Sequence, residues 1–138
     1  MQSKMTIPEM EAFLDEVFPQ VNGKFEVTDL APMTATVRMN VKEADLRPGG
    51  TISGPSMFAL ADVTFYIATL AMIGPEALTV TTSCNINFMR KPAATGLWAK
   101  ARILKLGRSL SVGDVDLFSA GSDKPVAHAS VTYSIPPK

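Results

Sequence analysis

The chain has 138 residues, 46% of them hydrophobic and 19% charged, a composition typical of one globular domain, which we expect to span residues 1–138. Thirteen basic residues balance thirteen acidic ones, so no overall field favours nucleic acid or an anionic membrane surface as a partner. The single cysteine, Cys84, excludes an intramolecular disulfide, and the polar start lacks the basic and apolar segments of a secretory signal, which predicts a cytoplasmic protein.

The predicted elements begin with a short amphipathic helix over residues 8–18, which ends before Pro19. Two strands follow, over residues 24–30 and 34–41, in which side-chain character alternates with a period near two. The break at Pro32 predicts a hairpin or another tight connection between them.

A long apolar segment comes next, over residues 57–73, and Asp62 is its only charged residue. The segment is shorter and more polar than the roughly 20 apolar residues that a membrane span needs. Uniform hydrophobicity without a polar face predicts instead a helix buried nearly all round inside a soluble domain. Pro55 suits the first turn of this helix, and Gly74 suits its end.

Four further strands are predicted over residues 77–89, 96–106, 109–120 and 125–135, separated by turn-like segments and arranged as a meander. The chain has no repeat and no low-complexity linker. The predicted fold class is therefore α+β: one antiparallel sheet wrapped around one long apolar helix.

Two segments carry a resemblance to a known family, "RPGGTISGPSMFALAD" at residues 47–62 and the strand, turn and strand pattern of residues 86–133. The chain resembles the hotdog-fold thioesterases over about residues 25–135, particularly the branch of phenylacetyl-CoA and other small acyl-CoA thioesterases (PaaI-like). The resemblance implies that Asp62 is the catalytic acid. It also implies that the backbone N–H of Gly54 is the oxyanion donor, and it aligns Gly50 with an earlier glycine of the family segment.

Three positions depart from the family segment. Arg47 stands where the family often has Asn, Ser53 where it has His, and Pro55 where it has a second Gly. The resemblance implies that these positions orient the thioester carbonyl or shape the helix start, so Arg47 and Ser53 are candidate substrate contacts. Gly54 keeps its N–H, at a helix N-terminus whose partial positive charge favours a developing oxyanion.

A carboxylate among apolar neighbours, as at Asp62, resists ionisation and can act as a general base on water or as a nucleophile. A structural interpretation stays open, in which Asp62 is a buried acid bonded to backbone groups or to a hydroxyl such as that of Thr81. Gly54 and Asp62 are eight residues apart, or roughly 12 Å along one helix, so one carbonyl cannot touch both. A shared site then requires two antiparallel helices in a homodimer, alone or within a dimer of dimers.

Other candidates come from the strands and turns. Alternation places Thr81 and Ser83 on one face of their strand, and the resemblance puts Thr81 where a hydroxyl holds the attacking water. Arg90, Lys91 and Arg108 flank turns that lie near the nucleotide end of CoA in the family, where cations would pair with phosphate. A structural interpretation stays open for these residues, because threonine favours strands and exposed cations favour solubility without any role in a site.

Several residues point to no site. His128 has no metal-ligating partner at suitable spacing, Cys84 lacks a nucleophile signature, and no Gly-x-Ser-x-Gly elbow or phosphate-binding loop occurs. The resemblance implies an acyl-CoA thioesterase, and the residues point to no metal or bound organic cofactor. The alternatives are a hotdog protein that binds acyl-CoA without turnover and a hotdog hydratase or dehydratase, which Ser53 disfavours because such enzymes usually have His there.

Overall fold

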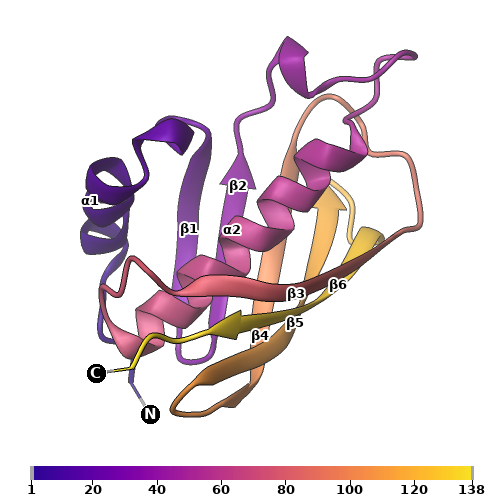
Figure 1. The fold of residues 1–138 in the computed structure, drawn as a ribbon. Helices are drawn as coiled ribbons and strands as arrows, with labels where there is room; N and C mark the ends of the chain where they lie inside the picture. Colours follow the sequence, from indigo (N-terminus) through magenta and orange to yellow (C-terminus); the bar gives the residue numbers. More distant parts are fainter. Residues whose placement is uncertain (1, 138) are drawn as a thin grey trace.

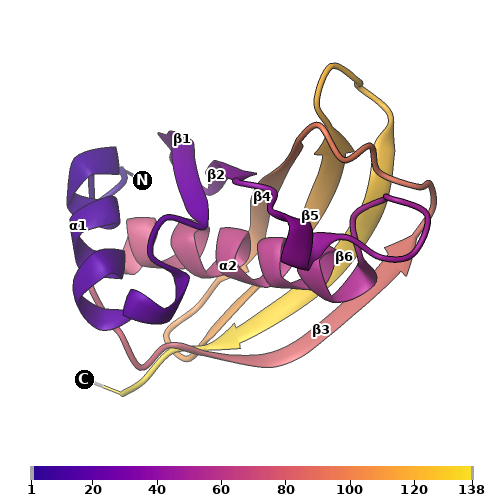
Figure 2. The same ribbon diagram turned by 90° about the horizontal axis from the view of Figure 1, so that it is seen from above.

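The computed structural model describes residues 2–137 and contains one curved, antiparallel, six-stranded sheet wrapped around a long helix (Figures 1 and 2). The strand order is β1-β2-β4-β5-β6-β3. The elements are α1 (Ile7–Val17), η1 (Pro19–Val21), β1 (Phe25–Ala31), β2 (Thr34–Met39), η2 (Glu43–Asp45), α2 (Gly54–Ile73), β3 (Val80–Phe88), β4 (Leu97–Leu106), β5 (Leu110–Ser119) and β6 (Pro125–Ser134). The predicted α+β class and the hotdog arrangement are confirmed.

Helix α2 is the core of the domain. It begins at Gly54, with Pro55 in its first turn as predicted, and the Ser53 hydroxyl accepts the Ser56 N–H at 3.3 Å and caps this turn. It ends at Gly74, whose φ of 98° a residue with a side chain rarely adopts. The helix is long and apolar enough to cross a membrane, but most of it is buried in the hollow of the sheet, as expected for a soluble α+β domain.

Helix α1 covers the edge of the sheet at β1 (Figure 2). Its start is fixed by a capping box in which Thr6 and Glu9 bond each other's backbone N–H groups. Further along the helix, the Glu11 carboxylate accepts the N–H of Val27 in β1 at 3.4 Å. Helix α1 therefore covers part of the β1 edge of the sheet.

Small residues on the sheet allow α2 to approach closely. The helix-facing positions of β2, β4 and β6 include Ala35, Ala99, Ala101, Ala127 and Ala129, all of which are fully buried. On β5, a Cβ at Gly113 would lie 2.1 Å from the carbonyl oxygen of Arg102 and 2.7 Å from the ring of Phe65. Glycine is required there by contact with its neighbours, not by its backbone angles.

The predicted meander is wrong for β3. Strands β4, β5 and β6 do follow one another, but β3 lies beside β6, with Thr81 opposite Tyr133. The reason is that the sheet curls around α2, so the strand that leaves the helix lies at the opposite edge from β1 (Figure 2).

The expectation that Ser83 shares a face with Thr81 is also wrong. A bulge between these two residues shifts the alternation, so Ser83 is exposed and Cys84 packs against the core instead.

Candidate active site

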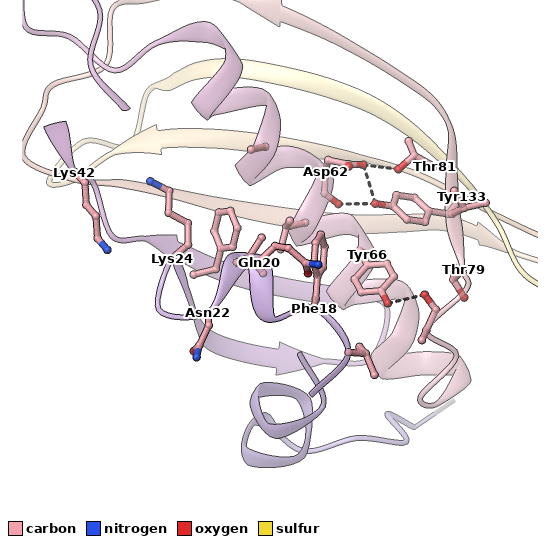
Figure 3. Close-up of a pocket in the computed structure, with 17 residues that line it drawn as sticks. Phe18, Gln20, Asn22, Lys24, Lys42, Asp62, Tyr66, Thr79, Thr81 and Tyr133 are labelled. Carbon is pink, nitrogen blue, oxygen red and sulfur yellow. Dashed lines mark hydrogen bonds between the residues drawn. The ribbon is translucent and has the colours of Figure 1, made fainter. Parts of the chain in front are cut away.

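The carboxylate of Asp62 is held by two hydroxyl groups. Its Oδ1 accepts a hydrogen bond from Thr81 at 2.7 Å and is 2.7 Å from the hydroxyl of Tyr133, which also lies 3.0 Å from the Asp62 carbonyl oxygen (Figure 3). Oδ2 has no hydrogen-bond partner among residues 2–137. The carboxylate is thus anchored through one oxygen, and the other is free to meet a water molecule or a substrate.

The pairing of β3 with β6 brings these two hydroxyls together. Thr81 and Tyr133 are directly opposite in the ladder, on the face of the sheet that meets α2. Burial, and then the nearby charge of Asp62, raise the pKa of Tyr133 well above its usual range. Tyr133 therefore stays protonated and can donate to the carboxylate at any physiological pH.

Asp62 opens into a cavity of about 830 Å³, here called the Asp62 cavity. Its wall combines aromatic, aliphatic and polar side chains from α1, η1, β1, α2, β3 and β6. The lining residues are Val17, Phe18, Gln20, Val21, Asn22, Lys24, Phe25, Lys42, Ala59, Asp62, Val63, Tyr66, Ala77, Thr79, Val80, Thr81 and Tyr133. Lys24 and Lys42 lie at the end away from Tyr66 and Thr79 (Figure 3). A mixed wall of this size suits a small organic group with a few directed polar contacts.

A second cavity, of about 370 Å³, lies at the start of α2 and is here called the Gly54 cavity. It brings together four residues singled out from the sequence, Arg47, Gly54, Arg90 and Lys91. No acceptor among residues 2–137 takes the N–H of Gly54. The cavity therefore offers a free backbone donor beside three cationic side chains, an arrangement that suits an anion.

Within one chain, the two cavities share no lining residue. Gly54 and Asp62 lie on the same α-helix, roughly 12 Å apart along its axis. Arg108 lines neither of these cavities; it lies in a third one with Lys4 and Ile135. One chain thus carries the predicted acid and the predicted oxyanion donor in separate places.

The loop before α2 is fixed by Asp45. This buried carboxylate accepts hydrogen bonds from the Ser56 hydroxyl and the Lys42 N–H, both at 2.8 Å, and pairs with Lys24. Burial alone would raise the pKa of Asp45, but these bonds, that of Lys24 foremost, hold the pKa below its ordinary value. With Ser53 as the N-cap, the network determines where the helix starts and hence where Gly54 lies.

Sequence reasoning missed Tyr133 and the aromatic residues of the Asp62 cavity, Phe18, Phe25 and Tyr66. Tyr133 lies on a predicted strand, and its inward position follows from alternation with buried Val131, but only the pairing of β3 with β6 reveals its contact with Asp62.

Two residues for which the sequence predicts no role lie outside the candidate site or are unreactive. Burial, and then the charge of Asp62, raise the pKa of the Cys84 thiol, so it stays protonated. His128 lies on the outer face of the sheet, 2.7 Å from Asp116.

Comparison with known proteins places this geometry in a family. Residues 49–126, more than half of the chain, match the thioesterase superfamily profile. A crystal structure from Silicibacter sp. TM1040, of a protein assigned as a thioesterase, is 54% identical, with a TM-score of 0.92, and the match covers 99% of this chain and 96% of that one.

Two further structures are similar. A mutant of the phenylacetic acid degradation protein PaaI from Thermus thermophilus is 30% identical, with a TM-score of 0.74 over 86% of this chain and 99% of that one. Zebra fish thioesterase superfamily member 2 is 24% identical and shares the fold, with a TM-score of 0.83 over 96% of this chain and 100% of that one. No curated protein matches the chain. The family profile and the structure at 54% identity agree, and the chain belongs to the thioesterase superfamily.

Proposed function

We propose that the protein is an acyl-CoA thioesterase, which hydrolyses a thioester to a carboxylic acid and free CoA, with Asp62 as the catalytic carboxylate. The observation that carries this proposal is the free Oδ2 of Asp62, at the wall of a cavity large enough for an acyl group. A carboxylate that served only to stabilise the fold would gain from bonds to both oxygens.

The chemistry follows from the position of this oxygen. As a general base, Oδ2 takes a proton from water while the water oxygen attacks the carbonyl carbon. The carbonyl oxygen becomes an oxyanion, which the N–H of a Gly54 can stabilise. The tetrahedral intermediate then collapses, the C–S bond breaks, and the sulfur takes the proton to give the CoA thiol. As a nucleophile, Oδ2 would instead attack the carbonyl carbon itself, and the C–S bond would break to release the CoA thiolate, which takes a proton from solvent. Water would then cleave the resulting anhydride to the carboxylic acid and the free carboxylate of Asp62.

The cationic residues of the Gly54 cavity are proposed to hold CoA. Arg47, Arg90 and Lys91 line the same cavity as Gly54 and would pair with the phosphates. Arg108, at the other end of α2, is a further candidate for such a pairing. CoA enters as part of the substrate, and the proposal includes no other cofactor.

A homodimer would unite the two cavities. Phe58 lies four residues from both Gly54 and Asp62, and it is an exposed large apolar side chain of α2. A two-fold axis near Phe58, with the two helices antiparallel, would place Gly54 of each chain beside the partner helix at the level of its Asp62.

The sheet supports the same assembly. Strand β3 is the edge of the sheet that α1 does not cover, and most of its residues are exposed, including Val80 and Phe88. Open edges of this length invite pairing with another strand.

The first test is Asp62→Asn, which removes the base or nucleophile but hardly changes the side-chain volume. We expect thiol release from a panel of acyl-CoAs to fall by a factor of at least about 10², while the far-UV circular dichroism and the melting temperature stay close to those of the wild type. Turnover within a few fold of wild type would exclude Asp62 as the catalytic residue. Wild-type protein that binds acyl-CoA but releases no thiol would indicate a binding protein instead.

The same variant tests the shared site. Gly54→Pro removes the N–H, whereas Gly54→Ala keeps it and serves as the control, because an added Cβ meets only the ring of Phe88 at 3.5 Å. Mixed with Asp62→Asn, the Gly54→Pro chain should restore about a quarter of wild-type activity, since half of a random mixture is heterodimer and each heterodimer has one intact site. Complete subunit exchange without recovery, with both parents folded, would contradict a shared site.

A further inference from the structure

One end of the Asp62 cavity is cationic. Lys24 and Lys42 both line the cavity, at the end away from Tyr66 and Thr79 (Figure 3). Among the described residues that line it, Asp62 is the one acid. The two lysines are therefore a feature of the cavity wall that the proposed hydrolysis does not use.

The chain itself neutralises one of these two charges. The amine of Lys24, which is partly exposed, pairs with the buried carboxylate of Asp45. The side chain of Lys42 is exposed and pairs with no carboxylate among residues 2–137. Lys42 contributes to the fold through its backbone N–H, which donates to Asp45 at 2.8 Å. Lys24 and Asp45 cancel, and the charge of Lys42 remains to meet an anion.

The distance of this end from Asp62 follows from the same network. Asp45 pairs with Lys24 and accepts the Ser56 hydroxyl at 2.8 Å, so the Lys24 amine lies near the level of Ser56 on α2. The backbone of Lys42 binds the same carboxylate and starts from the same level. Ser56 and Asp62 are six residues apart on α2, or roughly 9 Å along its axis.

This spacing sets the length of a ligand that would reach both ends. A carboxylate about 3 Å from an amine at the level of Ser56 would be roughly 6 Å from a thioester carbon beside Asp62. An extended chain spans about 3.5 Å for every three bonds, so this gap corresponds to about five bonds. A six-carbon dicarboxylic acyl group has that length.

The charges favour such a group. Roughly 9 Å is about one Debye length at physiological ionic strength, so the repulsion between Asp62 and a second anion is largely screened. The Lys42 amine, in contrast, would contact the bound carboxylate directly. A plain acyl chain gains nothing from this cation, because the amine then stays in water.

We propose that Lys42 is a specificity-determining residue, which favours acyl groups that end in a carboxylate about five bonds from the thioester carbon, as in adipoyl-CoA. This inference rests on the proposed function, because it takes the Asp62 cavity as the acyl site. Lys24 can bind the same carboxylate through N–H groups that Asp45 does not take, since an ammonium group has three donors. The protein should therefore bind a dicarboxylic acyl-CoA more tightly than the plain acyl-CoA of equal length.

The test compares adipoyl-, pimeloyl- and suberoyl-CoA with hexanoyl-, heptanoyl- and octanoyl-CoA. Binding is measured by calorimetry in the Asp62→Asn background, so that the result does not depend on turnover. We expect adipoyl-CoA or pimeloyl-CoA to bind more tightly than its plain counterpart. We expect Lys42→Met to reduce that preference by about 3- to 10-fold, between the value of an exposed ion pair and that of a hydrogen bond to a charged group. Lys42→Arg, which keeps the charge, should retain most of the preference.

The matched control is Lys105→Met. Lys105 is an exposed lysine of β4 and does not line the Asp62 cavity, so the preference should not change. Lys42→Met should melt at the temperature of the wild type, because the backbone N–H that binds Asp45 is kept.

The outcomes separate the two proposals. Equal binding of dicarboxylic and plain acyl-CoAs of the same length, or a preference that Lys42→Met leaves intact, would overturn the role of Lys42 alone. Equal weakening of the dicarboxylic and the plain acyl-CoAs by Lys42→Met would assign Lys42 to the phosphates of CoA and would also overturn that role. Absence of binding for every acyl-CoA, by folded protein, would overturn the proposed function and this inference with it.

Discussion

The substitution Tyr133→Phe removes one hydroxyl and leaves the ring in place. That hydroxyl is 2.7 Å from Oδ1 of Asp62, and a hydrogen bond to an ionised carboxylate is worth about 1.5–3 kcal/mol. The Thr81 hydroxyl still holds the same oxygen at 2.7 Å, so the carboxylate is loosened but not released. If the lost energy appears in the transition state, kcat should fall by about 10- to 150-fold, with little change in KM.

A second tyrosine provides the control for this experiment. Tyr66 lines the same cavity, but its hydroxyl donates to the carbonyl oxygen of Ala77 and makes no contact with Asp62. Tyr66→Phe should therefore keep kcat within about threefold of wild type, well inside the range of one weak hydrogen bond. Thiol release under saturating acyl-CoA measures kcat for both variants, and circular dichroism and thermal melting show whether each is folded. Similar losses in the two variants, or activity of folded Tyr133→Phe within about twofold of wild type, would refute the anchoring role of Tyr133.

Two further predictions concern stability. Gly113→Ala should lower the free energy of unfolding by about 3 kcal/mol or more, because its Cβ would overlap a backbone carbonyl oxygen that cannot move aside. Gly107→Ala is the control and should have a small effect, because its Cβ has ordinary contacts. Urea denaturation measures both, and equal losses would contradict the packing argument. Asp45→Asn should destabilise the protein at neutral pH by about 1–3 kcal/mol. Since the folded pKa of Asp45 is lowered, the stabilisation is complete above the unfolded pKa and is lost as pH falls through the folded pKa. The difference in the free energy of unfolding between variant and wild type should therefore shrink between neutral pH and about pH 2. A difference that stayed constant would show that the charge of Asp45 does not stabilise the fold.

The helix and most strands could be predicted because their signals are local. A long apolar run with one charged residue defines α2. The alternation of side chains defines β1, β2, β4, β5 and β6 to within a residue or two at most ends. The predicted strand over residues 34–41 is longer than β2, which ends at Met39. The order of the strands in the sheet is not a local property, which explains why the meander prediction failed for β3.

The candidate site, too, could be predicted only in part. Asp62, Gly54 and Thr81 came from the sequence together with the family resemblance, and Thr81 was expected to meet Asp62, as it does in the structure. Their catalytic roles stay predictions. Tyr133 was missed because its contact depends on the pairing of two strands, β3 and β6, that are not consecutive in the sequence.

The pairing of β3 with β6 also has a consequence for the order in which the protein is made. Tyr133 is 71 residues after Asp62, and within residues 2–137 the one strand that pairs with β3 is β6. At a synthesis rate of about 5–20 residues per second, α2 and β3 wait several seconds for the strand that completes them. During that interval β3 has both edges open, and the carboxylate of Asp62 lacks one of its two anchors. A ribosome that stalls before residue 125 would therefore hold a nascent chain in which β3 is unpaired and the part of α2 that β6 covers is exposed. Such a chain offers an open strand edge to other chains, so we expect it to depend on a chaperone.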